Sequence, residues 1–103
     1  MEDKKYTRYF KAFGDSTRFK IIQLLSAKEM SVNEITAAVG LSQPTVSRHL
    51  SVLRDAEVVV DRREGQQVYY RLNKNAVETC CTSFCDCLEI DVKAEGKAKK
   101  RKK

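Results

Sequence analysis

Apolar residues recur at three- and four-residue spacing through the first part of the chain, which is the pattern of amphipathic helices. The first stripe is aromatic and consists of Tyr6, Tyr9, Phe10 and Phe13. We expect it to pack mainly in the core, and in part against a second subunit. A second helix begins after Gly14, with Asp15 or Ser16 as its N-cap. Its predicted buried face consists of Phe19, Ile22 and Leu25.

Two shorter helices follow, and each has a clear start signal. Residues 28–30 are interpreted as a short link. Ser31 and Glu34 have the spacing of a capping box, so a third helix begins there and ends at Gly40. Ser42 is a good N-cap for a fourth helix, which tolerates Pro44 in its first turn. The residues predicted to face inward are Val32, Ile35 and Val39 on the third helix and Val46, Leu50 and Leu53 on the fourth.

The pattern changes to strands after the fourth helix and then returns to a helix. The runs "VVVDRR" and "VYYRL" flank the turn sequence "EGQQ", which predicts a two-stranded hairpin. Asn73 can cap a last helix. The apolar stripe of that helix is predicted to contain Val77, Cys80, Cys81, Phe84 and Leu88. The expected fold is therefore mainly α, with five helices and a small β-hairpin before the last one.

The third and fourth helices, joined by a tight turn with Gly40, predict a helix-turn-helix. A recognition helix needs one apolar face, short polar residues near its N-terminus and a long cation for a guanine or a phosphate. Helical rotation places Arg48 opposite the apolar face, with Thr45 and Ser51 beside it and Ser47 nearer the edge. His49 falls close to the inner edge, so it is interpreted as structural.

The hairpin supplies a second candidate DNA-binding element. Arg62 and Arg63 precede the turn at Gly65, and a hairpin that follows a recognition helix is a wing. Its cations are expected to lie along the phosphate backbone and to position the recognition helix. The alternative is an ordinary charged hairpin tip, which the acids Asp61 and Glu64 leave open.

The charge of the chain does not by itself indicate DNA binding. The 103 residues carry a formal net charge of +6. Residues 93–103 contain seven basic residues and one acidic residue, so the other 92 residues have no net charge. We therefore divide the chain into a folded domain, residues 1–92, and a basic disordered tail, residues 93–103, that can add salt-sensitive DNA affinity.

The sequence favours a cytoplasmic protein. No apolar run approaches the length of a membrane span, and the first ten residues lack a signal-peptide pattern. Thiols stay reduced in the cytoplasm. The four cysteines are then better explained as metal ligands or redox groups than as a disulfide framework.

The segment from Ser31 to Asn73, "SVNEITAAVGLSQPTVSRHLSVLRDAEVVVDRREGQQVYYRLN", resembles the ArsR/SmtB family of bacterial metal-responsive repressors. The resemblance implies a winged helix-turn-helix homodimer, formed through the first and last helices, that binds operator DNA and releases it with metal. It places Ser42, Gln43, Thr45, Ser47 and Arg48 at the DNA, and Arg62 and Arg63 in the wing. One departure is Glu57-Val58, where the family usually has Gly-Leu.

All four cysteines lie within eight residues of the last helix, Cys80, Cys81, Cys85 and Cys87, and the other 95 residues contain none. Two ligand sites known in the family are absent: Ser31 and Asn33 replace the cysteines of one, and the last helix has no histidine for the other. Burial as small hydrophobic residues could explain Cys81 but not Cys85 and Cys87. A thiolate-rich site without histidine selects soft ions.

The spacing C-C-x5-C is similar to that of some arsenic-responsive members of the family. The resemblance implies that Cys80, Cys81 and Cys87 bind As(III) or Sb(III), with Cys85 as a fourth ligand for Cd(II), Pb(II) or Zn(II). On one continuous helix, Cys80 and Cys87 are about 10.5 Å apart along the axis. Either the helix ends near residues 82–83 and the chain folds back, or a partner subunit contributes thiols.

Two other functions compete with metalloid sensing. The same fold could sense oxidants or persulfides through its closely spaced thiols. Alternatively, a winged helix with structural zinc could serve protein interaction. The sequence does not favour an enzyme, because there is no histidine near the thiols, no carboxylate pair with a plausible pocket and no phosphate-binding loop.

Overall fold

The computed structural model describes residues 3–88, apart from the side chains of Asp3, Lys5 and Cys87. The predicted tail, residues 93–103, and the predicted domain boundary at residue 92 lie outside these residues. The elements are, in order, α1 (Asp3–Phe13), α2 (Ser16–Ala27), β1 (Met30–Ser31), α3 (Val32–Val39), α4 (Gln43–Asp55), β2 (Val59–Glu64), β3 (Gln67–Leu72) and α5 (Lys74–Cys87). The predicted helix order with a hairpin before the last helix is confirmed. None of the helices within residues 3–88 has the length and apolar character to cross a bilayer.

The sheet has one more strand than the sequence analysis predicted. β1 pairs antiparallel with β3, with Met30 opposite Tyr70, and the strand order is β1-β3-β2. Interpreting residues 28–30 only as a link was therefore wrong. A two-residue strand is too short to show the alternation that identifies strands in a sequence. It joins the middle of β3 to the start of α3.

The core confirms the predicted inner face of α4 and corrects that of α2. Val46, Leu50 and Leu53 are fully buried. On α2, by contrast, Phe19 is 52% exposed, and Ile21 and Leu25 are the buried residues. The predicted stripe was out of phase because α2 is apolar on more than one side. The large aromatic ring of Phe19 stands at the surface.

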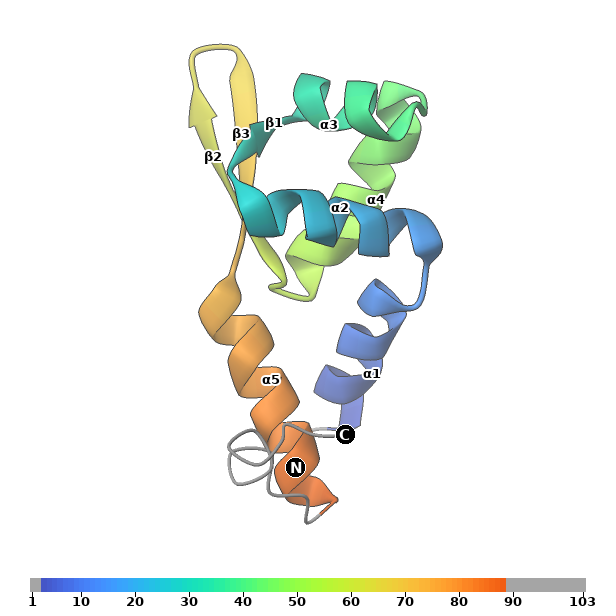
Figure 1. Ribbon diagram of the computed structural model, residues 1–103, viewed down its shortest axis with the longest axis vertical. Helices are drawn as coiled ribbons and strands as arrows, with labels where there is room; N and C mark the ends of the chain where they lie inside the picture. The colour runs from blue at the N-terminus through green and yellow to red at the C-terminus, as the bar shows by residue number, and fades with distance from the viewer. Residues whose placement is uncertain (1–2, 89–103) are drawn as a thin grey trace.

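α1 and α5 lie side by side at the end of the molecule opposite the tip of the β2–β3 hairpin (Figure 1). Aromatic contacts join them: the Phe10 and Phe84 rings meet edge to face with centroids 4.9 Å apart, and Tyr6 lies 6.0 Å from Phe84. The predicted apolar stripe of α5 is only partly correct. Cys80 is buried, but Cys81 is exposed and Leu88 is 54% exposed.

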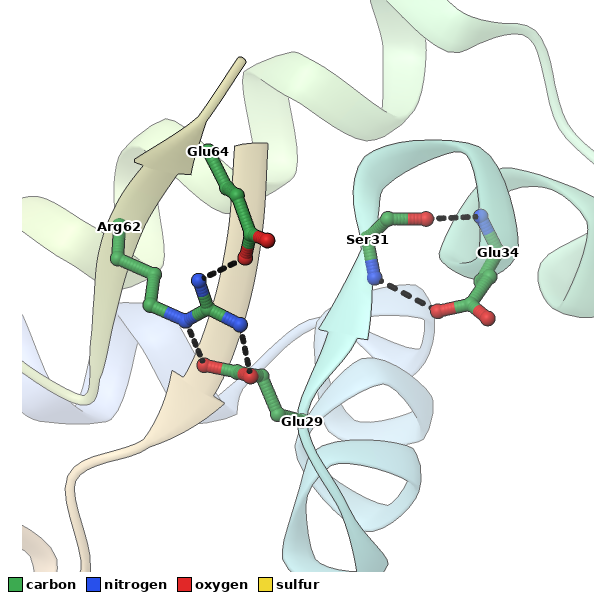
Figure 2. A network of polar contacts seen from close by, with 5 residues as sticks. All are labelled: Glu29, Ser31, Glu34, Arg62 and Glu64. Carbon is green, nitrogen blue, oxygen red and sulfur yellow. Dashed lines mark hydrogen bonds and ion pairs between the residues drawn. The ribbon is translucent and has the colours of Figure 1, made fainter. Parts of the chain in front are cut away.

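Helix caps fix the boundaries of the helix-turn-helix. Ser31 and Glu34 form the predicted capping box (Figure 2), and Gly40 ends α3 in the left-handed conformation, with φ of +72°. Ser42 caps α4, and its side chain accepts a hydrogen bond from the backbone N–H of Thr45. All five predicted cap positions are confirmed: Asp15, Ser31, Gly40, Ser42 and Asn73.

The C-terminus of α4 forms a Schellman motif around a strained residue. The N–H of Val58 donates to the carbonyl of Leu53 at 3.0 Å, and the N–H of Glu57 donates to the carbonyl of Arg54 at 2.9 Å. Glu57 is the residue in the left-handed conformation, with φ of +64°. This is the position where the family resemblance expects glycine, which adopts that conformation without a Cβ clash.

Candidate functional site

The first turn of α4 presents short polar side chains at one end of the molecule. Ser42 and Gln43 are exposed, and Thr45 is half-buried. The Ser42 hydroxyl donates to Oγ1 of Thr45 at 2.8 Å, so the two hydroxyls hold each other in place. Gln43 stands at the helix N-terminus with its amide at the surface. Figure 1 places this turn and the hairpin tip toward the same end of the molecule.

The middle of α4 carries the candidate base-reading cation. Arg48 and Ser47 are exposed, while Ser51 is half-buried. Within residues 3–88, Arg48 forms no ion pair, so its guanidinium is available to a ligand. The buried residues of α4 lie on the other side and hold the helix against the core. This division matches the requirement for a recognition helix.

Arg62 of the predicted wing is already bound by carboxylates. Its Nε and Nη2 each donate to a Glu29 oxygen at 2.9 Å, and Nη1 donates to Glu64 at 2.5 Å (Figure 2). The Arg62 guanidinium also lies 4.7 Å from the centre of the Tyr69 ring. The hydrogen bonds from Arg62 lower the pKa of Glu29. They also raise the pKa of Arg62 itself.

Sequence reasoning missed Glu29, because a carboxylate in a presumed link gives no sign of its partner on a distant strand. The bidentate pair fastens β2 to the segment that leads into β1 and α3. It holds the middle of β2 next to the start of the helix-turn-helix. Arg62 is therefore first of all a structural residue of the DNA-free form.

Arg63 is the other predicted wing cation, and its surroundings differ. It pairs with Val68 in the β2–β3 register, is exposed, and forms no ion pair with any described residue. Two residues further on, Gly65 turns the hairpin with φ of +62°. Asp61, which lowers the positive charge of the hairpin, lies 3.4 Å from Arg54 of α4.

His49 is confirmed as a residue with structural contacts, and its partner is Arg18 of α2. Nη1 of Arg18 lies 3.1 Å from Nδ1 of His49. The same guanidinium donates to the backbone carbonyls of Lys11 and Ala12, at 2.8 and 3.2 Å. Arg18 thus connects the end of α1 to the recognition helix. Sequence analysis missed this role of Arg18. An arginine on α2 is compatible with a solvent-exposed position, and nothing in the sequence indicates that its guanidinium has three acceptors.

The cysteine segment forms one continuous helix. α5 extends through Cys87, so the predicted option of a helix end near residues 82–83 with a fold-back is wrong. Hydrogen bonding continues because no proline or glycine interrupts residues 74–87. Cys80 is buried, Cys81 is exposed, and Cys85 is half-buried. The described side chains contain no group of three or more His, Cys, Asp or Glu residues that could hold a metal ion.

The thiol end of α5 is packed against α1. Tyr9 of α1 is 3% exposed. Burial raises the pKa of Tyr9, and the nearby Cys80 thiol raises it further. Cys80 of α5 therefore lies near Tyr9 of α1.

This arrangement of a helix-turn-helix followed by a β-hairpin defines a winged-helix DNA-binding protein. Residues 15–60 match the family described as "Bacterial regulatory protein, arsR family". The chain is 42% identical over 69 residues to the transcriptional repressor SdpR of Bacillus subtilis, covering 67% of this chain and 77% of that protein. The chain belongs to the ArsR family, as its sequence indicated.

Other relatives extend the comparison. The arsenic resistance transcriptional regulator ArsR1 of Pseudomonas putida is 49% identical over 65 residues, which cover 62% of this chain and 51% of that protein. The chain thus spans about half the length of that relative. The structure of HlyU from Vibrio cholerae superimposes with a TM-score of 0.69 at 31% identity, covering 84% of this chain and 97% of that one. SdpR and ArsR1 are both regulators of transcription.

Proposed function

We propose that this chain is a cytoplasmic repressor that binds operator DNA as a homodimer and is released by arsenite or antimonite. The observation that carries the proposal is that all four cysteines lie on α5, and α5 packs against α1. Arg18 of α2 connects the end of α1 to His49 on the recognition helix. Ligand binding at the thiols can therefore act on the DNA-binding face through packed elements.

DNA binding is assigned to the N-terminal half of α4 and to the wing. Ser42, Gln43, Thr45, Ser47, Arg48 and Ser51 lie on or beside the exposed face of α4, and Arg63 extends from the wing. Arg62 would reach a phosphate only by giving up its hydrogen bonds to Glu29 or Glu64. A dimer of such units reads two half-sites about one helical turn of DNA apart.

The proposed inducer site consists of Cys80, Cys81 and Cys87. Because α5 is continuous, Cys80 and Cys87 of one chain are about 10.5 Å apart along its axis. One trivalent ion cannot bridge that distance, so the site must combine thiols from two subunits. The dimer interface formed by α1 and α5 would bring them together. Cys85 could complete a four-thiolate site for Cd(II), Pb(II) or Zn(II).

The proposal is tested by fluorescence anisotropy on a labelled fragment of the chain's own promoter. The reduced protein should bind the fragment, and arsenite or antimonite should release it, because the ligand binds the DNA-free form more tightly. Cys81→Ser is the matched control, which should bind the fragment and keep it when arsenite is added. A complex that survives saturating arsenite, with all thiols titrated as reduced, contradicts the inducer assignment.

The same assay separates the competing functions. Release by peroxide or persulfide without metal, reversed by a reductant, would identify a thiol-based redox sensor of the same fold. Tightly bound zinc after purification, with no operator affinity at moderate salt, would identify a zinc-stabilised interaction module. Either result would replace metalloid sensing as the function.

A further inference from the structure

An open cavity of about 470 Å³ lies where three segments of the chain meet. It is lined by the last turn of α2, by the residues that lead into β1, and by the junction of β3 with α5. Figure 1 shows the end of α2 beside β3, and the two elements pack together. Leu25 and Leu72 supply the apolar part of the lining. The volume falls within the range of small-molecule sites, roughly 300–1,000 Å³.

Three basic residues line this cavity, and each comes from a different segment. They are Lys28 before β1, Arg71 at the end of β3 and Lys74 at the start of α5, and all three are exposed. Within residues 3–88, none of the three forms an ion pair. Residues 1–92 have no net charge, so three cations without a counter-ion are a local excess. They make the cavity attractive to an anion.

The carboxylate that lines the cavity does not neutralise these cations. Both oxygens of Glu29 accept hydrogen bonds from Arg62, at 2.9 Å each. These hydrogen bonds lower the pKa of Glu29, and the charges of Arg62 and then of Arg71 lower it further. Glu29 is therefore ionised and already bound by Arg62. Arg71 lies close enough to feel its charge without forming an ion pair.

Two asparagines add neutral hydrogen-bond donors to the lining. Oδ1 of Asn73 accepts the N–H of Ala76 at 3.2 Å, so its amide NH₂ group remains able to donate. Asn75 is exposed. The C-terminal end of α2 and the N-terminal end of α5 both border the cavity. Because their dipoles have opposite signs there, the side chains decide the charge of the cavity.

We propose that this cavity binds a small organic phosphate, with the phosphate group held by Lys28, Arg71 and Lys74. A phosphate monoester carries a charge of about −1.5 to −2 at neutral pH and three strong acceptor oxygens. It therefore suits three unpaired cations better than a single carboxylate does. The planar guanidinium of Arg71 can donate two parallel hydrogen bonds to phosphate. The organic group of the ligand would occupy the remaining volume and meet the asparagine amides.

This site is separate from the proposed inducer and DNA functions. Its lining contains neither a cysteine nor a residue assigned to DNA, and phosphate binding requires neither a dimer nor arsenite. Arsenite-driven release from DNA can therefore fail while phosphate binding stands, and the reverse also holds.

Ribose 5-phosphate is the probe, with ribose and inorganic phosphate as comparisons. The full chain, labelled with ¹⁵N, is titrated at low ionic strength, and binding is followed through its backbone amide signals. We expect ribose 5-phosphate to shift the amides of residues 25–29 and 71–75 in a saturable manner. Ribose should leave them unchanged, and inorganic phosphate should bind more weakly. Equal or tighter binding of inorganic phosphate, or shifts that do not saturate, would overturn the proposal.

Matched variants separate a site from general charge attraction. Arg71→Gln and Lys74→Gln should each weaken binding at least about tenfold, because each removes a charged hydrogen-bond donor. Arg71→Lys keeps the charge but loses the fork, so its affinity should lie between those of Arg71→Gln and the unaltered chain. Lys20→Gln on the exposed face of α2 makes the same charge change outside the cavity and should have no effect. All variants retain residues 93–103, so the basic tail contributes equally.

Urea denaturation without ligand shows whether the variants remain folded. All the substituted residues are exposed, so we expect unfolding curves close to that of the unaltered chain. Equal weakening by Lys20→Gln would show that only net charge matters and would overturn the site. A lower salt slope of operator binding for Arg71→Gln and Lys74→Gln, with ribose 5-phosphate affinity unchanged, would make these cations DNA contacts instead.

Discussion

Arg18 Nη1 lies 3.1 Å from His49 Nδ1, and this contact joins α2 to the recognition helix. A guanidinium can only donate hydrogen bonds, so Nδ1 of His49 is the acceptor and the ring proton is on Nε2. The other Arg18 donors reach the carbonyls of Lys11 and Ala12 at the end of α1. One side chain thus fixes the position of α4 relative to the helix that packs on the cysteines.

Arg18→Ala should weaken both the fold and the communication between sites. Loss of three hydrogen bonds from a charged group should lower the free energy of unfolding by about 1–3 kcal/mol, measured by urea denaturation. Arsenite should also change operator affinity by a smaller factor than in the unaltered chain. Lys20→Ala, an exposed change on the same helix, is the control. An unchanged arsenite effect would make Arg18 a purely structural residue.

Arg48→Ala should reduce sequence discrimination. If Arg48 reads a guanine, operator affinity should fall by about 1–3 kcal/mol while affinity for random DNA changes less. The measurement is anisotropy with operator and scrambled duplexes at fixed salt. Equal loss on both duplexes would show that Arg48 contacts only a phosphate.

The two wing arginines should behave differently. Arg63→Ala should lower the slope of log affinity against log salt by about 0.9, the value for one phosphate contact. Arg62→Ala should change the slope less and should instead destabilise the fold, because it leaves the Glu29 carboxylate without its bidentate partner. Binding titrations over a salt series, with urea denaturation of both variants, measure this. A larger slope change for Arg62→Ala would indicate that Arg62 exchanges its carboxylates for DNA.

Glu57→Gly should stabilise the protein. Glu57 has φ of +64°, which costs an L-residue about 1–2 kcal/mol, and glycine removes most of that cost. We expect a net gain of about 1 kcal/mol in the free energy of unfolding, after the entropy that glycine adds to the unfolded chain has been subtracted. Glu57→Ala removes the same charge but keeps the Cβ, so it should give no comparable gain. Equal gains from both variants would assign the effect to charge.

The elements with local signals could be predicted from the sequence, and the long-range pairings could not. The capping box at Ser31 and the apolar spacing of Val46, Leu50 and Leu53 depend on residues within one or two turns. The strand at Met30 and the Glu29–Arg62 pair depend on segments more than thirty residues apart, and neither leaves a local pattern. Phe19 was misplaced because the helical period does not decide which of two apolar faces is buried.

The cysteine site was predictable in its residue types but not in its geometry. The clustering of thiols in one helix indicates a soft-ion site, while only the structure shows that α5 stays helical through Cys87. The side chain of Cys80 is buried among the core residues, which the sequence could not distinguish from a ligand position. Which thiols could bind the same ion therefore depends on how two subunits are arranged.

Single cysteine substitutions should separate the arsenite ligands from the remaining thiol. Cys81→Ser and Cys87→Ser should bind the operator normally and lose arsenite-driven release, since a hydroxyl is a poor ligand for a soft ion. Cys80 is better changed to alanine, because a serine hydroxyl would be buried at a site that is 5% exposed. Cys85→Ser should retain the arsenite response, because three-coordinate arsenic does not use a fourth thiol.

Anisotropy with an arsenite titration of each variant, after its unfolding curve has been recorded, gives the comparison. The proposed site in which two subunits share the ligands adds a further expectation. In a heterodimer of one Cys80→Ala chain and one Cys87→Ser chain, neither chain has all three ligand thiols. If two subunits share a site, Cys80 and Cys81 of one chain and Cys87 of the other still form one complete set. Part of the arsenite-driven release should then return. If Cys85→Ser abolishes release as fully as Cys87→Ser, the arsenite ligands have been assigned wrongly.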